Sequence, residues 1–147
     1  MEAELISAIA NCVMAVGVLL LLWQIWLAKK QATTAFEDSM AKEYRELAAK
    51  IPTEALLGED LNPEDFKKTF DEFYHYIDLS NEEVFLRQRN RITEKTWKYW
   101  LDGIKSNLSK PAFKRAWEEI KEKADGSFME LRRLEENGFE GDPHTWR

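Results

Sequence analysis

An uncharged and strongly apolar run from Leu5 to Leu27 constrains the fold of this chain more than any other feature. Only small residues and the polar side chains of Asn11 and Gln24 interrupt it. At about 1.5 Å per residue, a helix of this length spans roughly 35 Å, which exceeds the thickness of about 30 Å of a membrane's hydrocarbon core. The sequence therefore predicts a single transmembrane helix, and the lipid bilayer is the first partner that it implies.

The residues that flank this run predict its orientation. A cleaved signal peptide has a basic leader and a shorter apolar stretch, whereas the leader here carries Glu2 and Glu4. Lys29 and Lys30 follow the other end, next to two tryptophans, and basic flanks stay on the cytoplasmic side of a membrane. We expect a single-pass protein with its N-terminus outside and its C-terminal domain in the cytoplasm.

The rest of the chain shows the spacing of helices and lacks the alternation with period two that strands require. The transmembrane helix is expected to continue to Ile51-Pro52, because the residue before a proline disfavours helical backbone. A central helix is expected to begin at Asn62-Pro63 and to reach Phe85, with Phe73, Tyr74 and Phe85 among the residues of its apolar side.

Shorter signals divide the remaining sequence into helices. Asn90 tolerates the left-handed backbone of a turn, Thr93 is typical of a helix cap, and Pro111 opens another helix. Ser127 and Glu130 have the spacing of a capping box for the last helix, which ends at Asn137-Gly138.

These patterns predict an all-α fold, in which one N-terminal transmembrane helix continues into a cytoplasmic bundle of about five helices. The expected domains are a transmembrane anchor at 1–30, a cytoplasmic α-helical domain at 31–137 and a C-terminal tail at 138–147.

The net charge of −6 argues against a nucleic-acid partner, but the charges are segregated along the chain. Residues 53–85 carry ten acids and two bases, and residues 86–115 carry two acids and nine bases. The basic segment is therefore the candidate contact surface.

Cys12 is the only cysteine, which excludes an intramolecular disulfide and a thiolate zinc site.

Four residues of the central helix share one face, because they lie at positions i, i+4, i+7 and i+11: Asp71, His75, Asp78 and Glu82. Acids and histidines at such spacings hold iron, manganese or zinc in helical bundles when a second helix adds ligands. No second helix offers a histidine, so the alternative is a polar flank of the helix. The expectation is that no metal is bound.

Catalytic motifs are also lacking in the sequence. Ser80 points about 140° away from His75 around the same helix, so the two cannot belong to one hydrolase triad. Neither a nucleophile elbow nor a phosphate-binding glycine loop occurs. We expect no enzymatic activity and no cofactor.

Several basic residues bracket a turn and a helix start, where backbone amides favour an anion. Trp97 lies among them and could stack on a base. A nucleotide-like anion or a lipid headgroup is one interpretation; the alternative is that the bases pair with Glu82 and Glu83 while the tryptophan fills the core. The candidate anion site comprises Arg87, Arg89, Arg91, Lys95, Lys98 and Trp97.

Ser7, Asn11 and Ala15 recur every four residues within the apolar run. Stripes of small residues let membrane helices approach each other closely, and an asparagine in the membrane is best satisfied across a helix pair. We expect a homo-oligomer or a membrane-protein partner; the alternative is that Asn11 is tolerated alone.

Between Phe73 and Ile120 the chain resembles a family of small bacterial membrane proteins that have one N-terminal transmembrane helix, a cytoplasmic helical domain and no characterised function. The resemblance implies the same topology in a bacterial inner membrane and implies no activity. A glycine is expected before Arg91 in this pattern, where the chain has Asn90. The matching residues are Tyr76-Ile77-Asp78-Leu79, Asn81-Glu82, Phe85-Leu86, Arg91-Ile92, Trp97, Trp100, Gly103-Ile104, Pro111-Ala112-Phe113 and Ala116-Trp117.

The sequence thus predicts a membrane-anchored, non-catalytic interaction or assembly module that self-associates. The alternative is a membrane effector or sensor gated by a nucleotide-like anion, as in stress or phage defence. A metal-dependent enzyme is a third and weaker interpretation.

Overall fold

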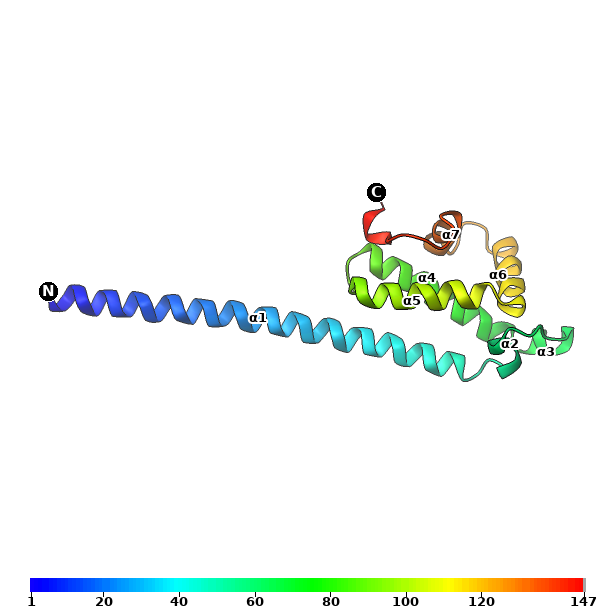
Figure 1. Cartoon of the computed structure of the whole chain (residues 1–147), viewed down its shortest axis with the longest axis horizontal. Helices are drawn as coiled ribbons and strands as arrows, with labels where there is room; N and C mark the ends of the chain where they lie inside the picture. The colour runs from blue at the N-terminus through cyan, green and yellow to red at the C-terminus, as the bar shows by residue number, and fades with distance from the viewer. Residues whose placement is uncertain (147) are drawn as a thin grey trace. The chain divides into compact units, whose positions relative to one another are not determined.

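The structure is a computed structural model that describes residues 1–146, and it is all-helical, with 79% of the chain in helices. Within these residues there are seven α-helices, one 3-10 turn and no strand. Figure 1 shows the helices in chain order. The prediction of an all-α fold is confirmed.

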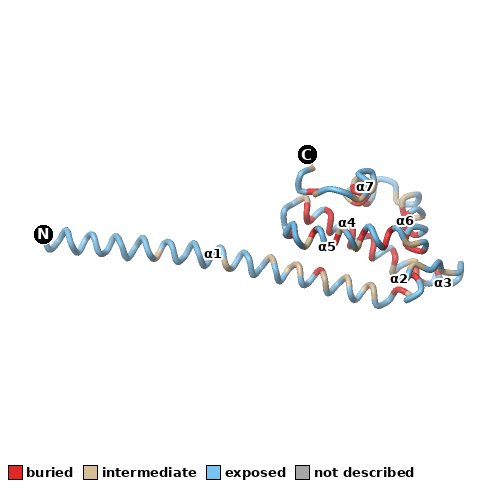
Figure 2. Tube along the Cα trace, viewed as in Figure 1, coloured by how far each residue is buried: buried red, intermediate tan, exposed pale blue. Residues whose placement is uncertain are grey.

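Helix α1 (Glu2–Ala48) is one continuous helix, and it runs through the apolar segment and well beyond it. The expected continuation past the apolar run is confirmed, and the helix ends just before Ile51-Pro52, as predicted. Among the described residues, α1 is the only helix long and apolar enough to cross a membrane. None of that apolar stretch is buried within the protein (Figure 2).

The chain forms two compact units, Met1–Phe36 and Glu37–Arg147. The first unit contains the apolar part of α1 and the charged residues that flank it. The second unit begins with the last residues of α1 and contains α2 (Thr53–Leu57), α3 (Pro63–Lys68), α4 (Phe70–Gln88), α5 (Glu94–Leu108), α6 (Pro111–Lys123), α7 (Met129–Glu136) and the 3-10 turn η1 (Pro143–Thr145).

Helix α4 is the centre of the second unit, because it contacts α3, α5, α6, α7 and η1. Its Phe73, Ile77 and Val84 are fully buried, and Figure 2 shows the buried residues of the helix in red. The ring of Phe73 lies 4.9 Å from that of Phe113 on α6. Each side chain of this size stabilises the fold by about 1.5–3 kcal/mol when it is fully buried.

Local capping signals account for several helix ends. The side chain of Asn62 accepts hydrogen bonds from the amides of Glu64 and Asp65 at 3.0 and 2.9 Å. Thr93 accepts from the amide of Thr96 at 3.3 Å, and Asn90 has a left-handed backbone with a φ of 54°. These three predictions are confirmed.

Two expected helix boundaries are wrong. The central helix does not run unbroken from Pro63, because Thr69 has φ −98° and ψ 0° and separates α3 from α4. Its amide is shared between the carbonyls of Asp65 and Phe66, at 3.0 and 3.2 Å. The β-branched side chain of threonine lowers helix propensity, which favours such a break.

The capping box at Ser127 does not form either. Phe128 precedes α7 with a left-handed φ of 58° and makes no side-chain cap. Its buried ring contacts the rings of Tyr74 and Trp117, with centroids 5.6 and 6.1 Å away. Packing of this ring therefore replaces the local hydrogen bonds that the spacing of Ser127 and Glu130 predicted.

Candidate functional site

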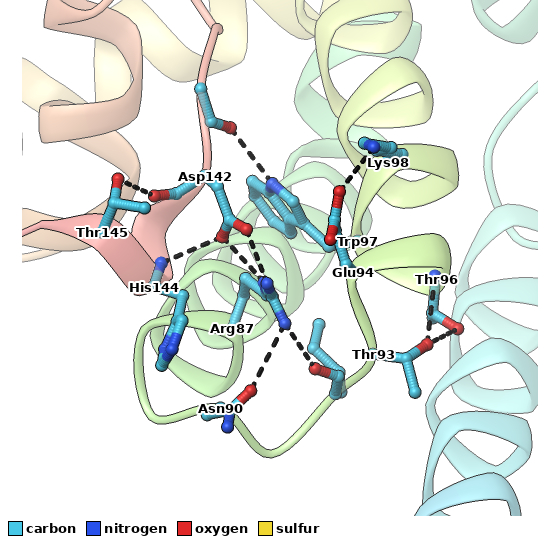
Figure 3. A network of polar contacts seen from close by, with 12 residues as sticks. Arg87, Asn90, Thr93, Glu94, Thr96, Trp97, Lys98, Asp142, His144 and Thr145 are labelled. Atoms are coloured by element: carbon cyan, nitrogen blue, oxygen red, sulfur yellow. Dashed lines mark hydrogen bonds and ion pairs between the residues drawn. The ribbon is translucent and has the colours of Figure 1, made fainter.

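Arg87, near the C-terminal end of α4, joins that helix to the end of the chain (Figure 3). Its side chain is only 6% exposed. Its Nε and Nη2 donate to the two carboxylate oxygens of Asp142 at 2.7 and 2.5 Å, and its Nη1 donates to the carbonyl of Ile92 at 2.9 Å. This two-bond geometry is the strongest form of an arginine–carboxylate pair.

The pair stabilises both charged groups. The hydrogen bonds from Arg87 hold the pKa of the Asp142 carboxyl below its usual value, and the same contact raises the pKa of Arg87. The amide of His144 also donates to Asp142, at 3.0 Å. Because Pro143 is buried and η1 contacts α4, the last residues described pack as part of the second unit.

The partner expected for Arg87 is therefore wrong. The alternative interpretation paired the basic residues with Glu82, Glu83 and the acidic central helix, whereas the structure pairs Arg87 with Asp142, 55 positions away in the sequence. Glu82 is exposed, and five positions before Arg87 it lies on another side of α4. The guanidinium of Arg87 lies against Asp142 on the returning chain (Figure 3).

Trp97 is a core residue, as the alternative interpretation of the basic set required. It is 1% exposed, and its Nε1 donates to the carbonyl of Gly141 at 3.2 Å (Figure 3). A base could not stack on a ring that is already covered. Gly141 and Asp142 thus hold two members of the candidate anion site from the same short segment.

The other basic residues of the candidate set stay at the surface. Arg89, Arg91, Lys95 and Lys98 are all exposed. Arg89 lies over the ring of Phe85, 5.2 Å from its centroid, and Lys98 pairs with Glu94 at 2.6 Å. An anion site at this corner stays a prediction, and Arg87 and Trp97 already have internal partners.

The four metal candidates do not form a metal centre in the described residues. Asp71, His75, Asp78 and Glu82 are exposed along α4, which agrees with a polar flank. Within residues 1–146, no three histidine, cysteine, aspartate or glutamate side chains lie close enough to hold a metal ion. The spacing places the four on one helix, but no other helix supplies the remaining ligands.

Ser7, Asn11 and Ala15 are exposed along α1 in the first unit. Their spacing puts them on one face of that continuous helix. Self-association through this face stays a prediction.

Glu83 is a buried acid of the second unit, and the sequence predicted only that it could pair with a basic residue. It is 5% exposed. Within the described residues its carboxyl group makes neither a hydrogen bond nor an ion pair. An acid this deeply buried normally has a partner, because an unpaired charge in the interior costs several kcal/mol.

Glu83 belongs to a buried polar stripe on α4 that consists of Tyr76, Ser80, Glu83 and Arg87. This stripe has the same spacing of i, i+4, i+7 and i+11 as the exposed stripe of Asp71, but it lies on the opposite part of the helix surface. The hydroxyl of Ser80 donates to the carbonyl of Tyr76 at 2.9 Å, and the amide of Asn107 donates to the Tyr76 hydroxyl at 3.0 Å.

Burial determines the protonation of this stripe. Burial, together with the nearby carboxylates of Glu43 and Glu82, raises the pKa of Glu83 to about 8. Burial also raises the pKa of the Tyr76 hydroxyl. Both groups are therefore mainly neutral at pH 7.

Glu83 and Tyr76 line a cavity of about 460 Å³ in the second unit. The other aromatic side chains that line it are Tyr44 on α1 and Tyr99 and Trp100 on α5. Arg45 and Asp102 supply one charge of each sign. The volume lies within the range of about 300–1,000 Å³ that is common for small-molecule sites.

A stricter reading of helical spacing would have found Glu83. It lies seven residues after Tyr76 and ten after Phe73, on the same face as both. Tyr74 and Phe85 were expected on the apolar side of the helix, whereas the structure leaves them 40% and 38% exposed. No signal in the sequence reveals the pairing of Arg87 with Asp142.

Comparison of the chain with protein-family models, with curated proteins and with solved structures finds no match. The resemblance to small single-span bacterial membrane proteins therefore stays a prediction.

Proposed function

We propose that the protein is a single-pass membrane protein whose helical second unit is a non-catalytic interaction or assembly module. The exposure of the apolar part of α1 carries the proposal. Leu19, Leu20, Leu21, Leu22 and Ile25 are each more than half exposed. Leaving each such side chain in water costs about 1.5–3 kcal/mol, and a helix covered with them on every side suits a lipid environment.

The flanks of α1 support an orientation with the N-terminus outside and the second unit in the cytoplasm. Lys30 lies over the ring of Trp26, with its Nζ 5.5 Å from the centroid, at the end of the apolar stretch. Tryptophan and lysine at this place suit the headgroup region and the cytoplasmic side of a membrane. We place the protein in a bacterial inner membrane, with its second unit forming a compact cytoplasmic bundle.

The partner in this proposal is a second copy of the chain or another membrane protein. Ser7, Asn11 and Ala15 form a face of small and polar side chains that lets two helices approach closely. Asn11 then finds a hydrogen-bond partner across the pair, which lipid cannot offer.

The internal partners of Arg87 and Trp97 weigh against the alternative of an anion-gated effector. An anion that used Arg87 would have to displace Asp142 from two charge-assisted hydrogen bonds. We therefore retain the assembly module as the proposed function.

Disulfide crosslinking of the full chain in native membranes tests this proposal. Cys12 is first changed to alanine, and a cysteine is then placed either at Ser7 or at Ile9, which faces almost the opposite side of the helix. We expect a covalent dimer with Ser7→Cys and much less with Ile9→Cys. Equal crosslinking at both positions would indicate random collisions, and monomers throughout would refute self-association.

A further inference from the structure

The cavity beside Glu83 combines two features that seldom occur together. One is the carboxyl group of Glu83, a residue that is only 5% exposed, which lacks a hydrogen-bond or ion-pair partner among the described residues, and the other is a lining rich in aromatic rings. Aromatic faces attract cations, and Trp and Tyr are the strongest of them. An ionised carboxylate in the same cavity attracts a cation much more strongly, because the surroundings screen charges poorly.

The charged groups around Glu83 also favour a cation. Glu43 on α1 and Glu82 on α4 act on Glu83 electrostatically, and Arg45 on α1 and Asp102 on α5 line the same cavity. Three of these four neighbours are acids. An anionic ligand would meet this negative charge, whereas a cation would reduce it.

The unpaired carboxylate favours a cation that carries N–H groups. Each carboxylate oxygen accepts hydrogen bonds, and a buried acceptor without a donor is costly. A primary ammonium group supplies donors and charge together, whereas a quaternary ammonium group supplies only charge. The apolar rest of the ligand would lie between the rings of Tyr44, Tyr76, Tyr99 and Trp100.

We propose that the cavity between the end of α1, α4 and α5 binds a primary organic ammonium ion, with its N–H groups on Glu83 and its apolar body against the aromatic rings. The ligand is either a free amine or the amine headgroup of a lipid, since the recognition chemistry is the same. This inference does not depend on self-association of α1.

Binding is coupled to the release of a proton. The carboxyl group is mainly protonated at pH 7, because its pKa is raised to about 8. An arriving ammonium ion favours the ionised form, so the proton of Glu83 passes to the solvent as the ion pair forms. The other charged groups that face Glu83 or line its cavity are Glu43, Arg45, Glu82 and Asp102.

Calorimetric titration tests the proposal on the full chain in nanodiscs of phosphatidylglycerol, which has no amine. The probe is 2-phenylethylamine, compared with the neutral 2-phenylethanol and with the trimethylated ammonium analogue. We expect the alcohol and the quaternary analogue to bind at least about tenfold more weakly than the amine. Binding at pH 7 should release close to one proton, measured in two buffers of different ionisation enthalpy, and almost none at pH 9.

Two matched variants locate the site. Glu83→Gln should weaken binding of the amine by about tenfold or more, whereas Asp71→Asn removes the same charge from an exposed acid on the same helix and should change it by less than about twofold. Tyr99→Ala should weaken binding a few-fold, because Tyr99 is 79% exposed and can be truncated without harm to the fold.

The outcomes separate the possible explanations. Equal affinities for the amine and the alcohol would show that the cavity binds only the apolar part of the probe. Unchanged affinity of Glu83→Gln for the amine would show that Glu83 does not contact the ligand. Either result overturns the proposal. Equal binding of the quaternary analogue would overturn the requirement for N–H donors. Adding phosphatidylethanolamine to the nanodiscs distinguishes the sources: competition with the probe supports a lipid headgroup, and no competition supports a soluble amine.

Discussion

Replacing Glu83 with glutamine is expected to stabilise the second unit, by an amount that grows with pH. In the unfolded chain this carboxyl loses its proton above its ordinary pKa of 4.5, whereas in the folded protein it keeps the proton up to about pH 8. The folded state therefore binds more protons between these values. The contribution of the Glu83 carboxyl to the free energy of unfolding is therefore most favourable below pH 4.5 and decreases as the pH rises from 4.5 to about 8.

The magnitude follows from the pKa difference. Each pKa unit corresponds to about 1.36 kcal/mol, so the shift from 4.5 to about 8 removes roughly 4 kcal/mol of stability by pH 8. Glutamine has nearly the same shape and no charge, so it avoids this loss. Its extra amide hydrogens also need acceptors, which reduces the expected gain to roughly 3 kcal/mol at pH 8 and to about zero at pH 4.5.

Urea unfolding of the full chain in lipid nanodiscs measures this gain, with tryptophan emission as the signal. Trp97, Trp100 and Trp117 are buried in the second unit and report its unfolding. Other titrating groups change both proteins alike, so the difference between wild type and Glu83→Gln isolates Glu83. The free energy of unfolding of Asp71→Asn, which removes an exposed acid from the same helix, should follow the pH dependence of the wild type. Parallel curves for Glu83→Gln from pH 5 to pH 8 would refute the reasoning, because they would show an ionised and solvated carboxyl in the folded state.

Two further predictions concern the corner at the end of α4. Asp142→Asn removes the charge that neutralises the buried guanidinium of Arg87. It should lower the free energy of unfolding by about 3 kcal/mol, or the Tm by roughly 10 °C for a unit of this size. The control Glu140→Gln, at an exposed neighbour, should lower it by less than about 0.5 kcal/mol. Because the pKa of Asp142 is lowered, the stability that its ionised form contributes is present at neutral pH and is lost as the pH falls below about 4. Thermal melts of Asp142→Asn should therefore lack this loss of stability in acid. Equal Tm values for Asp142→Asn and the wild type at pH 7 would contradict a stabilising pair between Asp142 and Arg87. Asn90→Ala should cost about 1 kcal/mol at a φ of 54°, and Asn90→Gly should be tolerated; the reverse order in Tm would show that the Asn90 side chain, and not its backbone, maintains the turn.

The parts of the fold that could be predicted are those encoded within one helical turn. The caps at Asn62 and Thr93 and the left-handed Asn90 each depend on contacts over a few residues, and all three form. The apolar helix could also be predicted, since length and composition alone define it. Such signals leave open which helix faces meet.

Ser127 shows where local reasoning fails. Its spacing to Glu130 would satisfy two backbone amides, a gain of about 1 kcal/mol. Burying the ring of Phe128 is worth about twice that, so tertiary packing determines where α7 begins. The same limit applies to Asp142, whose pairing with Arg87 depends on the whole path of the chain between them.

Glu83 and Asp142 show why acids of similar appearance in a sequence can differ in what they do. Asp142 accepts two hydrogen bonds from Arg87, and this pair is expected to stabilise the fold. Glu83 lines a cavity and has no such partner, so it is expected to reduce the stability of the fold at neutral pH. Proteins break the rules of stability mainly at functional sites, where the broken rule leaves a group ready to react or bind. The sequence drew attention to the basic corner, where Arg87 and Trp97 have internal partners. We propose instead that ligand binding in the second unit depends on Glu83, one helical turn before Arg87, whose carboxyl group has no such partner.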